Sequence, residues 1–133
     1  MRGTLYTDGG ARGNPGPAGT GFVLAIEGKK EITAGEYIGE TTNNRAEYKA
    51  LISGMLRAAK EGVTNLNCFL DSELVVRQMT GEYKVRDADL RPLSEQVRLV
   101  AEVIGSVTFR HVPRGNNKKA DQLVNDAIDR HLG

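Results

Sequence analysis

Two short apolar segments that each end in an aspartate constrain this chain more than any other feature. Leu5–Thr7 leads into Asp8 and two glycines, and Leu66–Leu70 leads into Asp71. Strand-forming residues followed by a turn predict two strands that each end at a carboxylate. Parallel strands bring their carboxyl ends to one edge of a sheet, where open α/β sheets carry their sites. Two ionised aspartates at about 4 Å repel by roughly 4 kcal/mol, so the pattern favours a divalent cation between them.

Length, charge and cysteine content narrow the class of protein. The 133 residues predict one domain, residues 1–133, and the net charge of +1 gives no strong overall attraction to nucleic acid. Any nucleic-acid binding must therefore come from a local patch. The single Cys68 excludes an internal disulfide and a cysteine-rich zinc site, and we expect a small core residue there. Without a long apolar segment or signal sequence, we expect a cytoplasmic monomer that makes no membrane contact.

Six glycines fall between Gly9 and Gly21, directly after the first predicted strand. A glycine-rich loop at such a place suggests a phosphate cradle. However, no Gly-Lys-Ser/Thr follows, and the next segment, Phe22–Ile26, is a strand rather than a helix, which excludes P-loop and dinucleotide-binding folds. We expect a wide turn into an antiparallel strand, with loop backbone that can approach a ligand closely.

The remaining segments predict an α/β layer plan, with a mixed five-stranded sheet in the order β-β-β-α-β-α-α-β-α. They comprise a strand to about Glu27, a hairpin turn at Gly28–Lys30, a strand over Glu31–Glu40, a helix with Asn44 as N-cap that runs to about Lys60, a short helix from Ser72 to about Met79, a polar loop over Glu82–Arg91, a helix from Pro92 through Ile104, a strand over Ser106–Val112, a loop over Pro113–Asn117 and a last helix from about Lys118 to Leu132.

Two more carboxylates have both an ordinary and a functional interpretation. Glu47 lies one turn before Leu51 and Met55, at the head of an apolar stripe, so its side chain points toward the sheet. The simpler interpretation is a capping box with Asn44. Asp121 falls in the first turn of the last helix, where a negative charge is favourable in any protein. Neither residue alone decides between the two interpretations.

Taken together, four segments resemble the motifs of type 1 ribonucleases H, in the same order and over essentially the whole chain. They are Thr7–Gly10 with Gly13–Gly19, Thr41–Glu47, Asp71–Ser72 and Asn117–Asp121. The resemblance implies a ribonuclease H-like fold and an endonuclease that cuts the RNA strand of an RNA–DNA hybrid, leaving 5′-phosphate and 3′-hydroxyl ends. It also implies two Mg²⁺ ions, which Mn²⁺ can replace, held by Asp8, Glu47, Asp71 and Asp121.

The same resemblance implies a set of substrate contacts. Backbone at Gly9 and Gly10 would approach the minor groove and read 2′-hydroxyl groups. The other implied contacts are Asn14, Thr42, Asn43, Asn44 and Ser72, with Thr42 and Asn43 forming a pocket for a DNA phosphate. The alternative interpretation of the asparagines is turn and cap chemistry.

The chain departs from the best-known bacterial members of that family in two places. Those members carry a long basic insertion, but the corresponding span, Thr80–Arg91, is short here and offers only three basic residues, Lys84, Arg86 and Arg91. We therefore expect weak, salt-dependent binding of the hybrid. The members also use a histidine before the fourth carboxylate. Here His111 falls in a predicted strand, so we expect Arg114, in the following loop, to assist catalysis instead.

Two alternatives from other classes stay open. The first is a catalytically idle module that binds hybrids, but an idle site has no reason to keep four mutually repelling acids. The second is a nuclease of the same fold that acts on double-stranded RNA. Recognition of 2′-hydroxyl groups disfavours a DNA duplex as substrate but not an RNA duplex.

Overall fold

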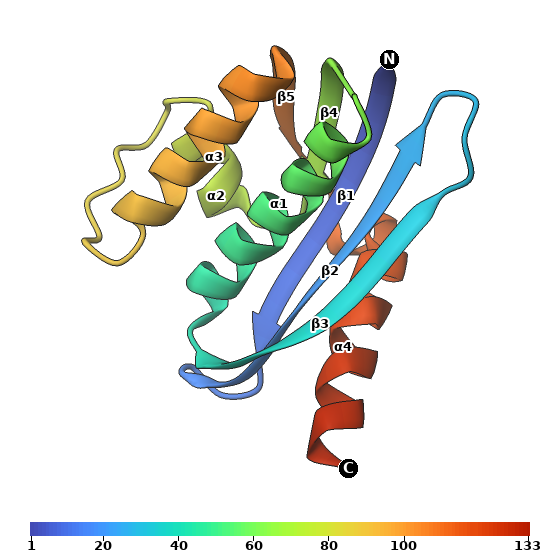
Figure 1. The fold of residues 1–133 in the computed structure, drawn as a ribbon. Helices are drawn as coiled ribbons and strands as arrows, with labels where there is room; N and C mark the ends of the chain where they lie inside the picture. The colour runs from blue at the N-terminus through green and yellow to red at the C-terminus, as the bar shows by residue number, and fades with distance from the viewer.

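A mixed five-stranded sheet forms the centre of the molecule (Figure 1). The computed structural model describes residues 1–133. The strands lie in the order β3-β2-β1-β4-β5, with β1–β2 and β2–β3 antiparallel and β1–β4 and β4–β5 parallel. The elements are β1 (Arg2–Ala11), β2 (Gly16–Ile26), β3 (Ile32–Thr41), α1 (Asn43–Lys60), β4 (Asn65–Leu70), α2 (Glu73–Met79), α3 (Arg91–Ile104), β5 (Ser106–His111), a 3₁₀ turn (Arg114–Asn116) and α4 (Lys118–Leu132). The predicted order of strands and helices is confirmed.

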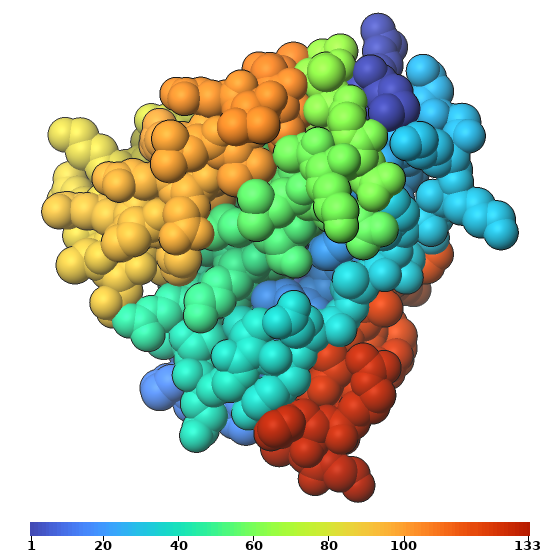
Figure 2. All heavy atoms as spheres, viewed as in Figure 1, coloured from blue at the N-terminus to red at the C-terminus, as the bar shows by residue number.

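Helices cover the two faces of the sheet unequally. α1 lies along β1 and packs against α3 on one face, whereas α4 packs on the other face across β2, β3 and β1 (Figure 1). The core between the sheet and α1 includes Leu5, Leu51 and Met55, which are fully buried, and also Cys68, as predicted. In the space-filling view, α3 and the loop before it project on one side and the end of α4 on another (Figure 2). None of the helices has the length and apolar character that a membrane crossing requires.

The glycine-rich segment differs from the predicted wide turn. β1 continues to Ala11 and β2 already begins at Gly16, so the turn is short. The glycines of β2 and β3 instead let α4 lie against the sheet at backbone distance. A Cβ atom on Gly21 would lie 2.5 Å from the carbonyl oxygen of Ala120, and one on Gly35 would lie 2.7 Å from that of Leu123. Such contacts between distant segments leave no local signal in the sequence.

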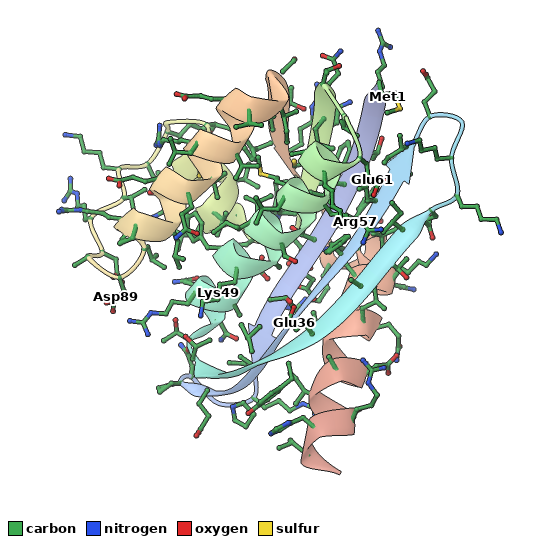
Figure 3. The ribbon with its side chains drawn as sticks, in the orientation of Figure 1. Met1, Glu36, Lys49, Arg57, Glu61 and Asp89 are labelled. Carbon is green, nitrogen blue, oxygen red and sulfur yellow. The ribbon has the colours of Figure 1, made fainter.

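The start of α1 also differs from the prediction. The N-cap is Thr42, whose side chain accepts a hydrogen bond from the Arg45 backbone N–H at 3.3 Å, and Asn44 already lies inside the helix. Arg45 in turn forms an ion pair with Asp89. Asp89 lies in the loop between α2 and α3, as Figure 3 shows. The capping box of Asn44 and Glu47 is therefore wrong, and the Glu47 carboxylate is left for another role.

The loop after α2 is held by a surface ion cluster. Arg77 donates hydrogen bonds to Glu73 and to Glu82, both at 2.8 Å, and its guanidinium carbon lies 5.5 Å from the centre of the Tyr83 ring. Lys84 and Arg86, which follow in the same loop, are exposed. Arg77 thus holds the short loop against α2, and the side chains of Lys84 and Arg86 stay exposed to solvent.

Candidate active site

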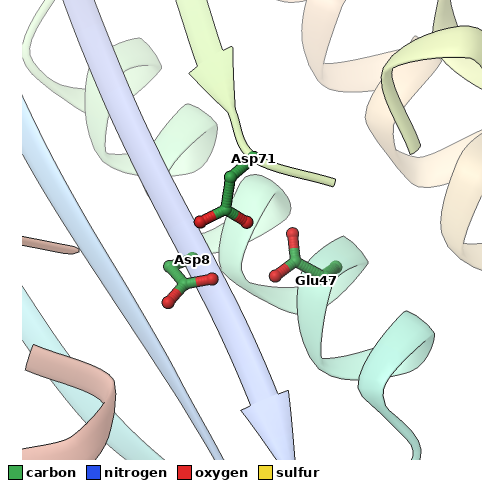
Figure 4. Close-up of side chains that lie close together, drawn as sticks. All are labelled: Asp8, Glu47 and Asp71. Carbon is green, nitrogen blue, oxygen red and sulfur yellow. The ribbon is translucent and has the colours of Figure 1, made fainter. Parts of the chain in front are cut away.

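Three carboxylates from three different elements meet at one edge of the sheet (Figure 4). Asp8 lies on β1, Glu47 on α1, and Asp71 directly after β4. Each offers one oxygen, and these oxygens all lie within 4.8 Å of one another. The parallel register of β1 and β4, in which Thr7 pairs with Leu70, places Asp8 and Asp71 side by side. The spatial pairing that the two strand ends predict is therefore present.

Glu47 is turned into the sheet by a backbone contact. The Gly9 N–H donates a hydrogen bond to Glu47 Oε1 at 2.9 Å, and Glu47 Oε2 is buried without a partner. The approach depends on glycine, because a Cβ atom at Gly9 would lie 2.2 Å from the carbonyl oxygen of Ala46. Glu47 thus belongs to the carboxylate cluster and does not cap α1.

Burial and mutual repulsion raise the pKa values of two of these acids, Asp8 and Glu47. The pKa of Asp8 is raised from its ordinary 3.8 to about 7, mainly by burial; a hydrogen bond with Glu47 opposes this rise, and Asp71 and Asp121 add to it. Burial, followed by the charge of Asp8, raises the pKa of Glu47 well above 4.5. No lysine or arginine forms an ion pair with the cluster. Clustered carboxylate oxygens with one unpartnered buried atom fit a hard divalent cation.

Asp121 lines the same cleft but is not one of the three acids whose oxygens lie close together. It occupies the first turn of α4, as predicted, and is half-buried. A cleft of about 370 Å³ is lined by all four carboxylates. Asp121 is not among the residues whose oxygens lie within 4.8 Å of one another. It nevertheless raises the pKa of Asp8 through a side-chain hydrogen bond and through its charge. The fourth acid therefore adjoins the cluster at Asp8.

Asn117 is a site residue that the sequence pattern does not reveal. Its side chain is buried, and Nδ2 donates to the Thr7 carbonyl oxygen at 2.8 Å and to Asp71 Oδ2 at 3.3 Å. It heads the segment Asn117–Asp121, which resembles the fourth motif, but the sequence predicts no contact for it. An asparagine at a helix start normally indicates an N-cap, yet the side chain forms no capping hydrogen bond. Asn117 instead connects β1 to the Asp71 carboxylate.

Arg114 lies in the loop and His111 in the strand, as the sequence predicts. Arg114 is exposed in the 3₁₀ turn and lines the cleft, whereas His111 is the last residue of β5 and does not line it. The placement of both side chains agrees with the choice of Arg114. Its catalytic role stays a prediction.

The predicted substrate residues fall into two groups. Those that line the cleft are Gly9, Gly10, Asn43, Asn44 and Ser72. Asn14 and Thr42 do not line the cleft, and their side chains form hydrogen bonds within the protein. Asn14 Oδ1 accepts from the Asn43 N–H at 2.9 Å, and Thr42 caps α1.

Two of the cleft-lining residues also make local hydrogen bonds. Asn43 Oδ1 accepts from the Ala11 N–H at 2.8 Å, and Ser72 caps α2. The turn and cap interpretation therefore holds for these side chains. The Nδ2 group of Asn43 forms none of the described hydrogen bonds, so it is available to donate to a bound molecule.

Comparisons with known proteins converge on one family. A family model described as reverse transcriptase-like matches residues 6–127. A bifunctional protein of Mycobacterium tuberculosis is 43% identical over 131 residues, which cover 97% of this chain and 36% of that protein. The chain thus spans little more than a third of that relative's length. A ribonuclease H of Pseudomonas putida is 36% identical over 141 residues, which cover 94% of this chain and 92% of that enzyme.

A solved structure extends the similarity to the arrangement in space. The crystal structure of LC11-RNase H1 in complex with an RNA/DNA hybrid is similar with a TM-score of 0.92 and 43% sequence identity. The match covers 98% of this chain and 99% of the other. The predicted fold is therefore confirmed over nearly the whole chain.

Proposed function

The chain belongs to the type 1 ribonuclease H family, and from this premise we propose that it hydrolyses the RNA strand of RNA–DNA hybrids and leaves 5′-phosphate and 3′-hydroxyl ends. The observation that carries the proposal is the meeting of Asp8, Glu47 and Asp71 within 4.8 Å, with Glu47 Oε2 unpartnered. A similar protein has been crystallised with an RNA/DNA hybrid, which supports the choice of substrate.

The acids are suited to hold divalent cations, which we propose are Mg²⁺ or, as a substitute, Mn²⁺. Asp8, Glu47 and Asp71 would hold them, together with Asp121, which adjoins Asp8 in the same cleft. Bound there, two ions would activate water and stabilise the leaving oxygen of a phosphodiester. Without a cation, the acids repel a phosphate, so the chain alone disfavours its own substrate at this place.

The rest of the cleft is suited to position the hybrid. Gly9 and Gly10 lack side chains, so the backbone of β1 lies open to the minor groove, where 2′-hydroxyl groups mark the RNA strand. Asn43 Nδ2 and the Asn44 side chain are available to donate hydrogen bonds to the sugar-phosphate backbone. Arg114, on the cleft wall, would attract a phosphate near the acids. We propose that the protein acts as a monomer in the cytoplasm.

Cleavage of matched duplexes tests the proposal. RNA–DNA, RNA–RNA and DNA–DNA duplexes of one sequence are incubated with Mg²⁺, Mn²⁺ or a chelator. We expect cleavage of the RNA strand of the hybrid with either metal and none with the chelator. Asp126→Asn is the matched control for Asp121→Asn, because both acids lie on α4 but Asp126 faces Gln122 rather than the cleft.

Three results would contradict the proposal. The first is no hybrid cleavage with either metal, which would indicate a binding module. The second is preferential cleavage of the RNA duplex, which would make double-stranded RNA the substrate. The third is full activity of Asp121→Asn, which would remove that acid from the site.

A further inference from the structure

The face of the sheet that points away from α1 carries a row of side chains across four neighbouring strands. The register aligns Val23 of β2 with Tyr6 of β1, Tyr6 with Phe69 of β4, and Phe69 with Arg110 of β5. Leu5, Cys68 and other neighbours in these strands are buried in the core beneath α1. Side chains alternate along a strand, so the row faces the opposite side. The Tyr6 and Phe69 rings stack at 5.1 Å with an angle of 20° between their planes, and both are half-buried.

Away from the cleft, the charge on this face is basic. The outward residues from Arg2 to Tyr6 of β1 and along β4 and β5 are the two aromatic residues, five Thr, Ser or Asn residues, and Arg2 and Arg110. The next outward residue of β1 is Asp8, which lies in the cleft. Neither arginine forms an ion pair. Thr108 Oγ1 donates to Asn67 Oδ1 at 2.7 Å, which leaves the Asn67 amide free to donate. The face therefore combines partly exposed aromatic surface, hydrogen-bond donors and unpaired positive charge.

A hollow of about 230 Å³ adjoins the Tyr6 ring, between the sheet and the start of α4. Its apolar wall includes Tyr6, Val23 and Ala25, and its polar wall includes Asn116, Asn117 and the ion pair of Lys119 with Glu31. Since Phe69 stacks on one side of the Tyr6 ring, the other side is turned toward Val23 and the hollow. Asn117 separates this hollow from the carboxylates, because its amide reaches Asp71 in the cleft. The hollow is thus a second site, behind the first.

We propose that this face binds single-stranded nucleic acid, with one base in the hollow against Tyr6 and phosphates near Arg110 and Arg2. Bases stack on aromatic side chains regardless of sequence, and a basic surface follows the phosphates. A face with two unpaired arginines, on which Glu31 at the hollow is paired with Lys119, is complementary to a polyanion, and its Asn and Thr groups suit base edges and sugars. This binding is separate from hybrid cleavage and does not depend on it.

Binding of a fluorescein-labelled oligouridylate, followed by anisotropy in chelator over a range of salt concentrations, tests the proposal. We expect Phe69→Leu, which keeps an apolar side chain but removes the ring, to weaken binding roughly tenfold. Arg110→Gln should weaken binding and reduce the log–log salt slope by about 0.7, the value for one phosphate contact on a single strand. The matched control is Arg98→Gln, an exposed arginine of α3 on the other side of the sheet, which should bind like wild type.

Cross-linking locates the bound strand. A 4-thiouridine probe should cross-link to β1 and β4 around residues 6 and 69. Cross-links confined to residues 41–47 would overturn the proposal, because they place the strand in the cleft. So would equal binding by wild type, Phe69→Leu and Arg110→Gln, or an equal loss in Arg98→Gln. Arg110 is fully on the surface, so its variant tests binding even if Phe69→Leu melts early.

Two further measurements separate this proposal from its alternatives. Analytical ultracentrifugation asks whether a second copy of the chain covers the face, and a dimer that Arg110→Gln dissociates would overturn the proposal. Cleavage of a blunt hybrid is measured in parallel and should be unchanged in Arg110→Gln. If wild type fails to cleave but binds the oligouridylate with the expected cross-links, the proposed activity is wrong and the second site stands.

Discussion

The two acidic clusters of this molecule differ in what completes them. On the surface, Glu73 and Glu82 each accept a hydrogen bond from Arg77 at 2.8 Å. In the cleft, Asp8, Glu47 and Asp71 meet without an ion pair, and Glu47 keeps an unpartnered oxygen. The surface cluster is satisfied within the chain and is screened by water, so it contributes little to stability. The carboxylates of the cleft cluster repel one another and have no basic partner within the chain, so only a bound cation can neutralise them. This distinguishes a ligand site from a structural ion pair.

The largest expected difference between the clusters is in catalysis. Asp71→Asn should lower Mg²⁺-dependent cleavage of a hybrid by more than about a hundredfold, because even the loss of an outer partner of a metal ligand costs 10- to 100-fold. Glu73→Gln, two residues away, should cleave like wild type. The measurement is the initial rate with both proteins at equal concentration. Similar rates for the two variants would remove Asp71 from the site.

Cation binding should stabilise only the protein with an intact cleft. At a Mg²⁺ concentration one hundred times the Kd, we expect wild type to gain about 2.7 kcal/mol in the free energy of unfolding. Glu73→Gln should gain the same, and Asp8→Asn less. In chelator, Asp8→Asn should be at least as stable as wild type, because it removes one of the repelling charges. Thermal melting with and without Mg²⁺ checks both points, and an Asp8→Asn variant that melts early in chelator contradicts the repulsion argument.

Without metal, stability should depend on pH through the cleft acids. The pKa of Asp8 is about 7 in the folded protein and near 3.8 in the unfolded chain, so the folded state binds the proton more tightly. Its contribution to stability is complete below about pH 3.8 and is lost as the pH rises to about 7. We expect wild type to lose about 4 kcal/mol relative to Asp8→Asn over this range. Denaturant unfolding in chelator at several pH values measures this loss of stability. If the free energies of unfolding of the two proteins change with pH in parallel, the predicted role of Asp8 is wrong.

The basic residue on the cleft wall should matter less than the acids. Arg114→Ala should lower turnover roughly tenfold, because a charged contact with a phosphate is lost. His111→Ala, outside the cleft, is the matched control and should stay near wild type. Steady-state cleavage of the hybrid by the two folded variants decides the point. The opposite order of activities would assign the catalytic role to the histidine.

The smallest effect is expected in the surface cluster. Arg77→Gln should cost less than about 1 kcal/mol, and the cost should shrink in high salt, because all three side chains are partly exposed. Urea unfolding at low and high salt measures it. A larger, salt-independent loss would show that the loop anchored by Arg77 contributes to the core.

Local patterns were enough to predict the strands, the helices and the pairing of Asp8 with Asp71, whereas Glu47 and Asp121 were assigned through the family resemblance. The strand ends at Asp8 and Asp71 follow from residue type and from the geometry of parallel strands. Two features could not be predicted because they depend on contacts between distant segments. Asn117 holds Asp71 from the start of α4, and the Gly9 N–H removes Glu47 from a capping role. The glycines of β2 were assigned to a turn, although they serve the close approach of α4.

The acids that line the cleft lie at positions 8, 47, 71 and 121, so the complete cleft forms only after β1 and α4 have come together. During synthesis, Asp8 is made before β4 and well before α4, which packs against glycines of the sheet. Long-range pairing of this kind forms late in folding. A ribosome-bound chain that lacks α4 therefore carries an incomplete set of acids.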